Sequence, residues 1–144
     1  MSTEQNKAIV RRYREAHNSN RLDQLDEIVD VNLISHNLLP GLPPGLEGGK
    51  MAHMGGVASF PDLQVRTEDL IAEGDKVVER WTQTGTYTGA SFMGAPVNGK
   101  RFSVSGTSIY RIANGKIVEH WSEMNFFGVL VQLGVIPALG QAVP

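Results

Sequence analysis

The sequence contains no cysteine, and no apolar run in it approaches the ~20 residues that a membrane-spanning helix needs. The first absence excludes thiol catalysis and disulfides, and it is typical of a reducing compartment. Residues 1–7 hold no apolar signal core, so we expect a soluble, cytoplasmic protein with no membrane partner. The net charge is only −2 and both signs are interspersed, so the sequence predicts no nucleic-acid partner.

The sequence signatures of several enzyme classes are also missing. The four histidines form no H-x-x-x-H pattern and do not cluster with carboxylates, so we expect no metal site. The chain has no P-loop, no G-x-S-x-G elbow and no G-x-G-x-x-G motif after a strand, so nucleotide chemistry is unsupported. We therefore expect a protein that works without a cofactor.

The chain is long enough, at 144 residues and 41% hydrophobic, for one globular domain over residues 1–144. Helical signals come first, because Ser2 and Gln5 are typical of a capping box and apolar residues then recur at helical spacing. Period-two alternation dominates the second half. We predict helices over residues 2–17, 22–29, 47–60 and 126–133, and strands over residues 32–37, 63–71, 76–88, 102–112 and 116–125.

This order of elements predicts an α+β fold. In it, the N-terminal helices pack on a curved antiparallel or mixed sheet, and the whole forms a cone-shaped barrel that encloses a cavity. The strand over residues 32–37 is short and mixed in character, so we expect it at an edge of the sheet.

The clearest pattern lies in residues 102–125, where two alternating strands are joined by a short turn. If the turn had two residues, Ser108 would lie opposite Trp121, and the apolar face of one strand would continue the charged face of the other. A three-residue loop, with Gly115 in the left-handed conformation of a bulge, instead pairs Ser108 with His120. We predict this second register because it puts apolar side chains of both strands on one face.

That face is apolar with a few convergent polar groups, which is typical of the wall of a small-molecule pocket. We expect the ligand to contact Ser108, Tyr110, Val118, His120, Ser122 and Met124. The imidazole of His120 is expected to titrate near neutral pH. The opposite face carries Ile109, Ile117 and Trp121 among charged residues, which predicts a homodimer interface.

Several segments resemble a known family. The run N-G-K-I-V-E-H-W at residues 114–121 is followed by F-G-V-L-V-Q-L-G at 127–134, and F-P-D-L at 60–63, E-G-D-K-V-V at 73–78 and R-W-T at 80–82 lie earlier. Together they resemble SnoaL-like proteins, the polyketide and ester cyclase group of the nuclear-transport-factor-two-like superfamily. The resemblance implies an α+β cone, a dimer and, in cyclases of the group, cofactor-free aldol ring closure of polyketide esters.

In those cyclases a base removes an acidic proton between two carbonyl groups, and an acid protonates the accepting ketone. The resemblance places the acid/base aspartate of the family at position 122 and its partner histidine at position 108. In this chain both positions are serine, Ser122 and Ser108. We therefore expect His120 to act as the base, with Ser108 and Ser122 as hydrogen-bond donors and His36 as a further ligand contact.

Two functions remain open at this stage. The first is a cofactor-independent cyclase, or a related isomerase or hydrolase, that acts on a small apolar carbonyl compound. The second is a non-catalytic module that binds such a compound, in which neighbouring hydroxyl groups hold the ring of His120 by hydrogen bonds. Trp81 is expected only to pack, because buried or interfacial packing is the usual role of an indole.

Overall fold

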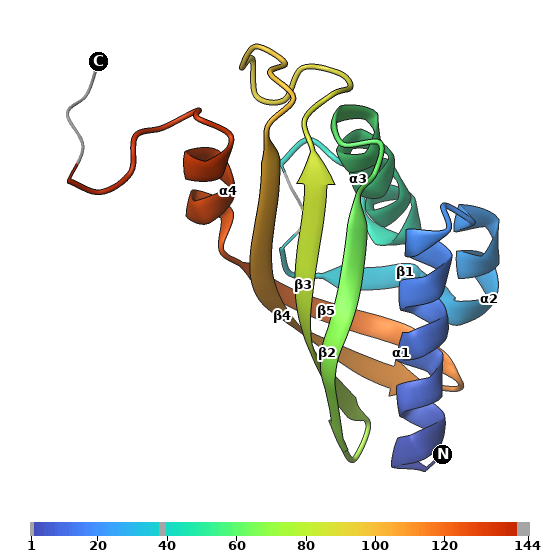
Figure 1. The fold of residues 1–144 in the computed structure, drawn as a ribbon. Coiled ribbons are helices and arrows are strands. Elements are labelled where there is room, and N and C mark those ends of the chain that lie inside the picture. The colour runs from blue at the N-terminus through green and yellow to red at the C-terminus, as the bar shows by residue number, and fades with distance from the viewer. Residues whose placement is uncertain (1, 38–39, 141–144) are drawn as a thin grey trace.

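In the computed structural model, which describes residues 2–37 and 40–140, helices pack on one face of a curved five-stranded sheet (Figure 1). The helical segments are α1 (Thr3–Asn18), the 3-10 turn η1 (Leu22–Gln24), α2 (Leu25–Ile28), α3 (Gly45–Ser59) and α4 (Phe126–Gln132). The strands are β1 (Val29–Ser35), β2 (Gln64–Glu73), β3 (Lys76–Thr86), β4 (Arg101–Ala113) and β5 (Lys116–Met124). This arrangement confirms the α+β class. Within the described residues, no helix has the length and apolar character needed to cross a bilayer.

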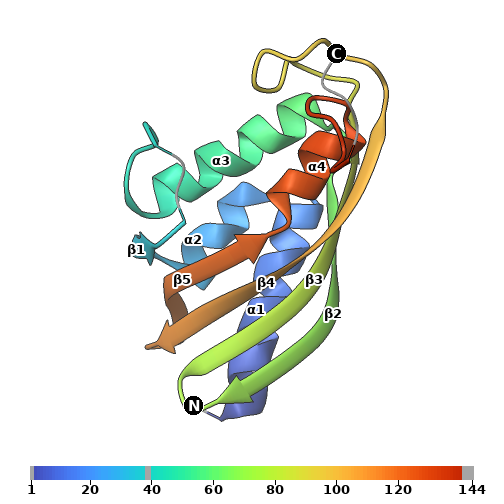
Figure 2. The same ribbon diagram turned by 90° about the vertical axis from the view of Figure 1, so that its left-hand side faces the viewer.

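The sheet is mixed and open. Its strand order is β1-β5-β4-β3-β2, with β1 parallel to β5 and the other neighbouring strands antiparallel. Because β1 and β2 form opposite edges, the barrel expected from the sequence is a curved sheet that does not close on itself. Figure 2 shows the strands β2 to β4 bending along their length. The edge position predicted for residues 32–37 is confirmed, although β1 begins at Val29.

The first helix begins as its sequence predicts. The Ser2 hydroxyl oxygen accepts the backbone N–H of Gln5 at 3.1 Å, and the Gln5 side-chain oxygen accepts the backbone N–H of Ser2 at 2.8 Å. This capping box satisfies two donors at the helix start. Ile9 and Val10 are buried in the main core, so α1 covers the sheet through its apolar side.

The hairpin between β4 and β5 corrects the predicted register. Ser108 lies opposite Ser122, two residues beyond its expected partner. The turn has two residues, Asn114 and Gly115, and their φ angles of 52° and 77° are those of a type I′ turn. Such a turn alone would mismatch the two faces. The mismatch is removed by a bulge at Val118, which adds one residue to β5.

The bulge determines which residues of β5 face the helices. Beyond it, His120 and Ser122 lie on the same face as Ser108, as the sequence predicted. Before it, Ile117 lies opposite Ile112 and is only 1% exposed, within the main core. The prediction that Ile117 belongs to the outer face was therefore wrong, because alternation along β5 is interrupted at the bulge.

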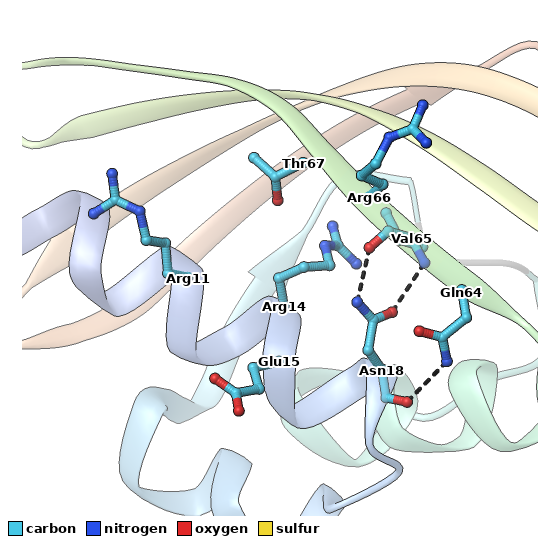
Figure 3. Close-up of a pocket in the computed structure, with 8 residues that line it drawn as sticks. All are labelled: Arg11, Arg14, Glu15, Asn18, Gln64, Val65, Arg66 and Thr67. Atoms are coloured by element: carbon cyan, nitrogen blue, oxygen red, sulfur yellow. Dashed lines mark hydrogen bonds between the residues drawn. The ribbon is translucent and has the colours of Figure 1, made fainter.

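The last residue of α1 ties this helix to the edge strand β2. The side-chain amide of Asn18 donates to the carbonyl oxygen of Val65 at 2.8 Å, and its oxygen accepts the backbone N–H of Val65 at 2.9 Å (Figure 3). Gln64 adds a hydrogen bond to the carbonyl oxygen of Asn18 at 3.0 Å. One side chain thus bonds both backbone groups that Val65 directs away from the sheet.

Candidate active site

The register of the central strands places polar residues in rows across the inner face of the sheet, which is the face that the helices cover. Glu79 of β3 lies opposite Ser108 of β4, which in turn lies opposite Ser122 of β5. In the neighbouring row, Tyr110 lies opposite His120. Strand pairing therefore brings together side chains that are far apart in the sequence.

Glu79 is fully buried, at 0% exposure, and is the centre of a hydrogen-bond network. Arg14 of α1 donates to its carboxylate through two nitrogens, at 2.7 and 3.1 Å, and Tyr110 and Thr67 each donate a hydroxyl at 2.7 Å. Burial raises the pKa of Glu79, but these hydrogen bonds and the positive charge of Arg14 outweigh it, so the pKa lies below its usual value. Each carboxylate oxygen already has two donors, and the group is not available as a base.

Ser108 and Ser122 form a hydroxyl pair, with their oxygens 3.0 Å apart. Ser108 is only 2% exposed, and its oxygen also accepts the indole N–H of Trp81 at 2.9 Å. Ser122 is half-buried, and its backbone N–H donates to the side-chain oxygen of Asn37, just after β1. The pair therefore has one deeply buried member and one member that lies near the end of β1.

Trp81 reaches Ser108 because residue 106 is glycine. A Cβ atom at Gly106 would overlap the indole ring of Trp81 and would lie 2.7 Å from the backbone oxygen of Glu123. Any larger residue would displace either the ring or the neighbouring strand. The glycine thus determines where the indole N–H lies.

His120 lies in the row next to the serine pair. Its ring stacks on Tyr110, with ring centroids 5.0 Å apart and planes inclined by 19°. Its nitrogens form no hydrogen bond within the part of the chain that the structure describes, so neighbouring hydroxyl groups do not hold the ring. Burial, together with the charge of Arg14, lowers the pKa of His120 to about 4. The expectation that this imidazole titrates near neutral pH was therefore wrong, and at neutral pH the ring is uncharged.

The remaining predicted ligand contacts are spread more widely. His36 lies with the outer-face residue Trp121, on which its ring stacks at 4.8 Å, and its Nε2 is 2.7 Å from a carboxylate oxygen of Glu119. It does not join the serine pair. Val118 is the half-buried bulge residue, and Met124 at the end of β5 is 37% exposed.

The helices add aromatic residues that the sequence did not single out as part of a site. The ring of Tyr13 lies 5.3 Å from that of Tyr110 and 4.3 Å from that of His17, whose ring lies 4.9 Å from that of His53 on α3. Burial lowers the pKa of His17 to about 3, although its Nδ1 lies 2.9 Å from the carbonyl oxygen of Tyr13. Helical spacing in the sequence identified only an apolar side of α1. The aromatic rings on that side were the signal that could have indicated a site.

A cavity of about 440 Å³ lies between α1 and β2 (Figure 3). Three arginines line it, Arg11, Arg14 and Arg66. Their charges are balanced, because Arg14 pairs with Glu79, Arg66 pairs with a neighbouring glutamate at 2.7 Å, and Glu15 lines the cavity one helical turn from Arg11. The cavity therefore offers no excess charge to an ion. Its lining includes Arg14 and Thr67, which both bond Glu79, but neither the serine pair nor His120. We locate the candidate site at the serine pair and His120.

The chain is similar to known proteins over nearly its whole length. A family model described as SnoaL-like polyketide cyclase matches residues 7–133. Among curated protein sequences, none is significantly similar to the chain. The structure of TsrD from Streptomyces laurentii is 30% identical, with a TM-score of 0.85, over 94% of this chain and 99% of that one.

Two further solved structures carry names that state a function. IdmH from Streptomyces antibioticus, a proposed polyketide cyclase, is 32% identical with a TM-score of 0.78, over 90% of this chain and 98% of that one. A SnoaL-like polyketide cyclase from Agrobacterium tumefaciens is 28% identical with a TM-score of 0.76, over 93% of this chain and 100% of that one.

Proposed function

This chain belongs to the SnoaL-like polyketide cyclase family, and from this premise we propose that it is a cofactor-independent enzyme that closes a ring in a small apolar carbonyl compound. One observation carries the proposal. The uncharged ring of His120, which has no hydrogen-bond partner among the described residues, lies next to the paired hydroxyl groups of Ser108 and Ser122. A base and hydrogen-bond donors are thus adjacent on one face.

The proposed reaction is intramolecular carbon–carbon bond formation. His120 takes a proton from a carbon between two carbonyl groups, and the electron pair of the C–H bond moves onto a carbonyl oxygen to give an enolate. The enolate carbon then bonds to a ketone carbon of the same molecule, and the ketone oxygen takes the proton back from the imidazolium. The substrate keeps all its atoms, so the step needs no oxidant or reductant.

The low pKa of His120 has two consequences for this reaction. At neutral pH nearly every molecule holds the ring in its unprotonated form, so the base is ready. A base with a pKa of about 4 is weak, however, and abstracts a proton only if its charged form gains stabilisation during the step. The enolate supplies that stabilisation, because a negative charge a few ångströms away raises the pKa of an imidazole.

The test is the substitution His120→Gln, which keeps a polar side chain of similar size but removes the base. With a panel of polyketide methyl esters and β-keto esters, we expect kcat to fall about 100- to 10,000-fold, because general-base catalysis contributes that much, while KM changes little. His36→Gln is the matched control, because His36 lies with Trp121 on the outer face, and its turnover is expected to equal that of the wild type. Equal turnover of the His120 variant and the wild type would rule out the proposed base.

The second candidate function is a binding module without catalysis. It is favoured by Ser122 and Ser108, which stand where the family resemblance places the acid/base aspartate and histidine. A hydroxyl group orients a carbonyl group but does not remove a proton near neutral pH unless another group deprotonates it. Tight binding of panel compounds with no turnover by the wild-type protein would identify the binding module.

We also propose that the chain forms a homodimer through the outer face of the sheet. Ile34 on β1 is 51% exposed, and it shares this face with Ile109 and Trp121, which are half-buried. The charged pair Arg111 and Glu119 lies beside them, at 2.7 Å, which gives the mixed polarity of many dimer interfaces.

Sedimentation equilibrium tests the dimer. We expect the wild type to have twice the chain mass of 15.7 kDa, and Ile109→Glu to sediment as a monomer because a carboxylate would be buried without a partner. Ala8→Glu is the control, since residue 8 is exposed on α1, which lies on the other face of the sheet. A wild type that stays monomeric at high protein concentration would contradict this part of the proposal.

A further inference from the structure

The hydroxyl pair is part of a longer chain of hydrogen bonds, and this chain begins at a group that can only donate. The indole N–H of Trp81 has no lone pair to offer, so the oxygen of Ser108 must be the acceptor of their 2.9 Å bond. Ser108 has one further polar partner among the described residues, the hydroxyl of Ser122 at 3.0 Å. The direction of this second bond decides what the site offers to a ligand.

Burial fixes that direction. Ser108 is 2% exposed and Trp81 is 5% exposed, so water does not replace a missing partner for the Ser108 hydrogen. If Ser122 donated to Ser108, the Ser108 oxygen would accept two bonds while its own hydrogen had no acceptor, which costs about 1–3 kcal/mol. If Ser108 donates to Ser122, the indole hydrogen of Trp81 and the hydroxyl hydrogen of Ser108 both have an acceptor. The bonds therefore run from Trp81 through Ser108 to Ser122.

We infer that the chain Trp81–Ser108–Ser122 is a directed relay that presents the hydroxyl hydrogen of Ser122 to a ketone or enolate oxygen of the ligand. The inference rests on the proposed function, which places the ligand at this face, and it deepens that proposal by naming the ligand atom that the serine pair binds. Trp81 is a positioning residue, because it acts through Ser108 without touching the ligand.

The charges around the relay favour a ligand oxygen that becomes negative. A carboxylate at residue 122 would accept hydrogen bonds and repel an enolate, whereas a hydroxyl that already accepts from Ser108 donates outward. The nearest inner-face carboxylate, Glu79, is neutralised by Arg14 and bonded by two hydroxyl groups. Hydrogen bonds in a chain also polarise one another, so the donor at its end is stronger than an isolated hydroxyl.

Binding of 4-nitrophenolate tests the relay, because this probe is an aromatic oxyanion and needs no turnover. Its affinity is compared with that of nitrobenzene, which has the same ring and nitro group but no oxyanion, at a pH at which the phenol is ionised. We expect the wild type to bind 4-nitrophenolate more tightly. The absorption band of the phenolate bound to the wild type is expected at shorter wavelength than that of the phenolate bound to Ser122→Ala, because a hydrogen-bond donor to the oxygen shortens the wavelength.

The variants remove the two ends of the hydrogen-bond chain, first the outward donor Ser122 and then the first donor Trp81. Ser122→Ala should weaken 4-nitrophenolate binding about 10- to 100-fold, the value of a hydrogen bond to a charged group, and leave nitrobenzene binding unchanged. Trp81→Phe removes the first donor and should weaken phenolate binding about 3- to 10-fold with a smaller spectral shift. Ser122→Thr keeps a hydroxyl and should retain binding. Trp121→Phe is the matched control, because it removes an indole N–H from the opposite face.

Each result bears on one proposal separately. Equal binding of the two probes by the wild type, or unchanged phenolate binding by both Ser122→Ala and Trp81→Phe, would overturn the relay. Loss of turnover in His120→Gln, together with phenolate binding that is unchanged in both Ser122→Ala and Trp81→Phe, would leave the proposed base intact and remove only the relay. Conversely, phenolate selectivity that depends on Ser122, without any turnover, would retain the relay and reject the enzyme. If Trp81→Phe unfolds, the Ser122 pair of variants decides the outcome.

Discussion

The variant Glu79→Ala is expected to lose about 3–5 kcal/mol of unfolding free energy, the usual effect of removing one partner from a buried ion pair. In this protein the loss has a specific origin. Arg14 would keep its charge, because the guanidinium is not deprotonated in proteins, but would lose both of its bonds to the carboxylate. The hydroxyl groups of Tyr110 and Thr67 would also lose their acceptor. Urea unfolding, followed by circular dichroism, measures the change.

Two comparisons separate the buried pair from a general charge effect. Glu68→Ala removes a carboxylate that pairs with Arg66 at the surface, where solvent screens the charges, so a much smaller loss is expected. The double variant Arg14→Met/Glu79→Leu replaces both charges by apolar groups and should recover most of the stability lost in Glu79→Ala. If the single and double variants are equally unstable, the loss comes from packing around Glu79 and the ion pair is not its cause.

Acidification is expected to destabilise the fold between about pH 6.5 and pH 4 through two buried histidines. The pKa of His17 is lowered to about 3 and that of His120 to about 4, mainly by burial, against an unfolded value of 6.5. The unfolded chain therefore binds more protons in this window, so stability is fully present above pH 6.5 and falls as the pH decreases. At pH 5 each ring is expected to cost about 2 kcal/mol relative to pH 7.

The pH range in which the two histidines lower stability is distinguishable from the range in which the carboxylates do so. Glu79 and Asp62 have lowered pKa values, so their contribution is lost only at more acidic pH, below the unfolded carboxylate range. Denaturant unfolding of His17→Gln and His120→Gln from pH 7.5 to pH 4.5 tests the assignment. At pH 7.5 the variants report lost packing alone, and towards pH 5 their stability should fall less steeply than that of the wild type. Parallel pH profiles for wild type and variants would contradict it.

The face of the sheet on which each residue of β4 and β5 lies was largely predictable from the sequence, whereas the pairing register of the two strands was not. Alternation along residues 102–125 placed Ser108, His120 and Ser122 on one face, and the structure has them there. A three-residue loop and a two-residue turn followed by a bulge give the same parity, so the face assignment survived an incorrect turn. The register depends on where the extra residue is accommodated, and no local feature of Val118 marks it as a bulge. Because the position of the bulge could not be predicted, Ile117 was assigned to the wrong face.

The polar network around Glu79 was missed although a signal was present. Val77, Glu79 and Trp81 are buried and alternate along β3 with the half-buried Val78 and the exposed Arg80, so period two places Glu79 on the same face as Val77 and Trp81. A buried carboxylate in turn requires a cation. Its partner, Arg14, comes from a helix 65 positions earlier, and helical spacing gives no indication of which strand that helix covers. Long-range pairing of this kind follows from the packed fold and not from local pattern.

The attachment of Asn18 to Val65 bears on how this protein associates with others. A border strand normally leaves backbone donors and acceptors open to any foreign strand, and such strands promote aggregation. Here a side-chain amide occupies the open N–H and C=O of Val65, so an incoming chain would first have to detach the end of α1. This intramolecular bond adds to the charged side chains of β2, such as Arg66 and Asp69, in protecting the border from foreign strands.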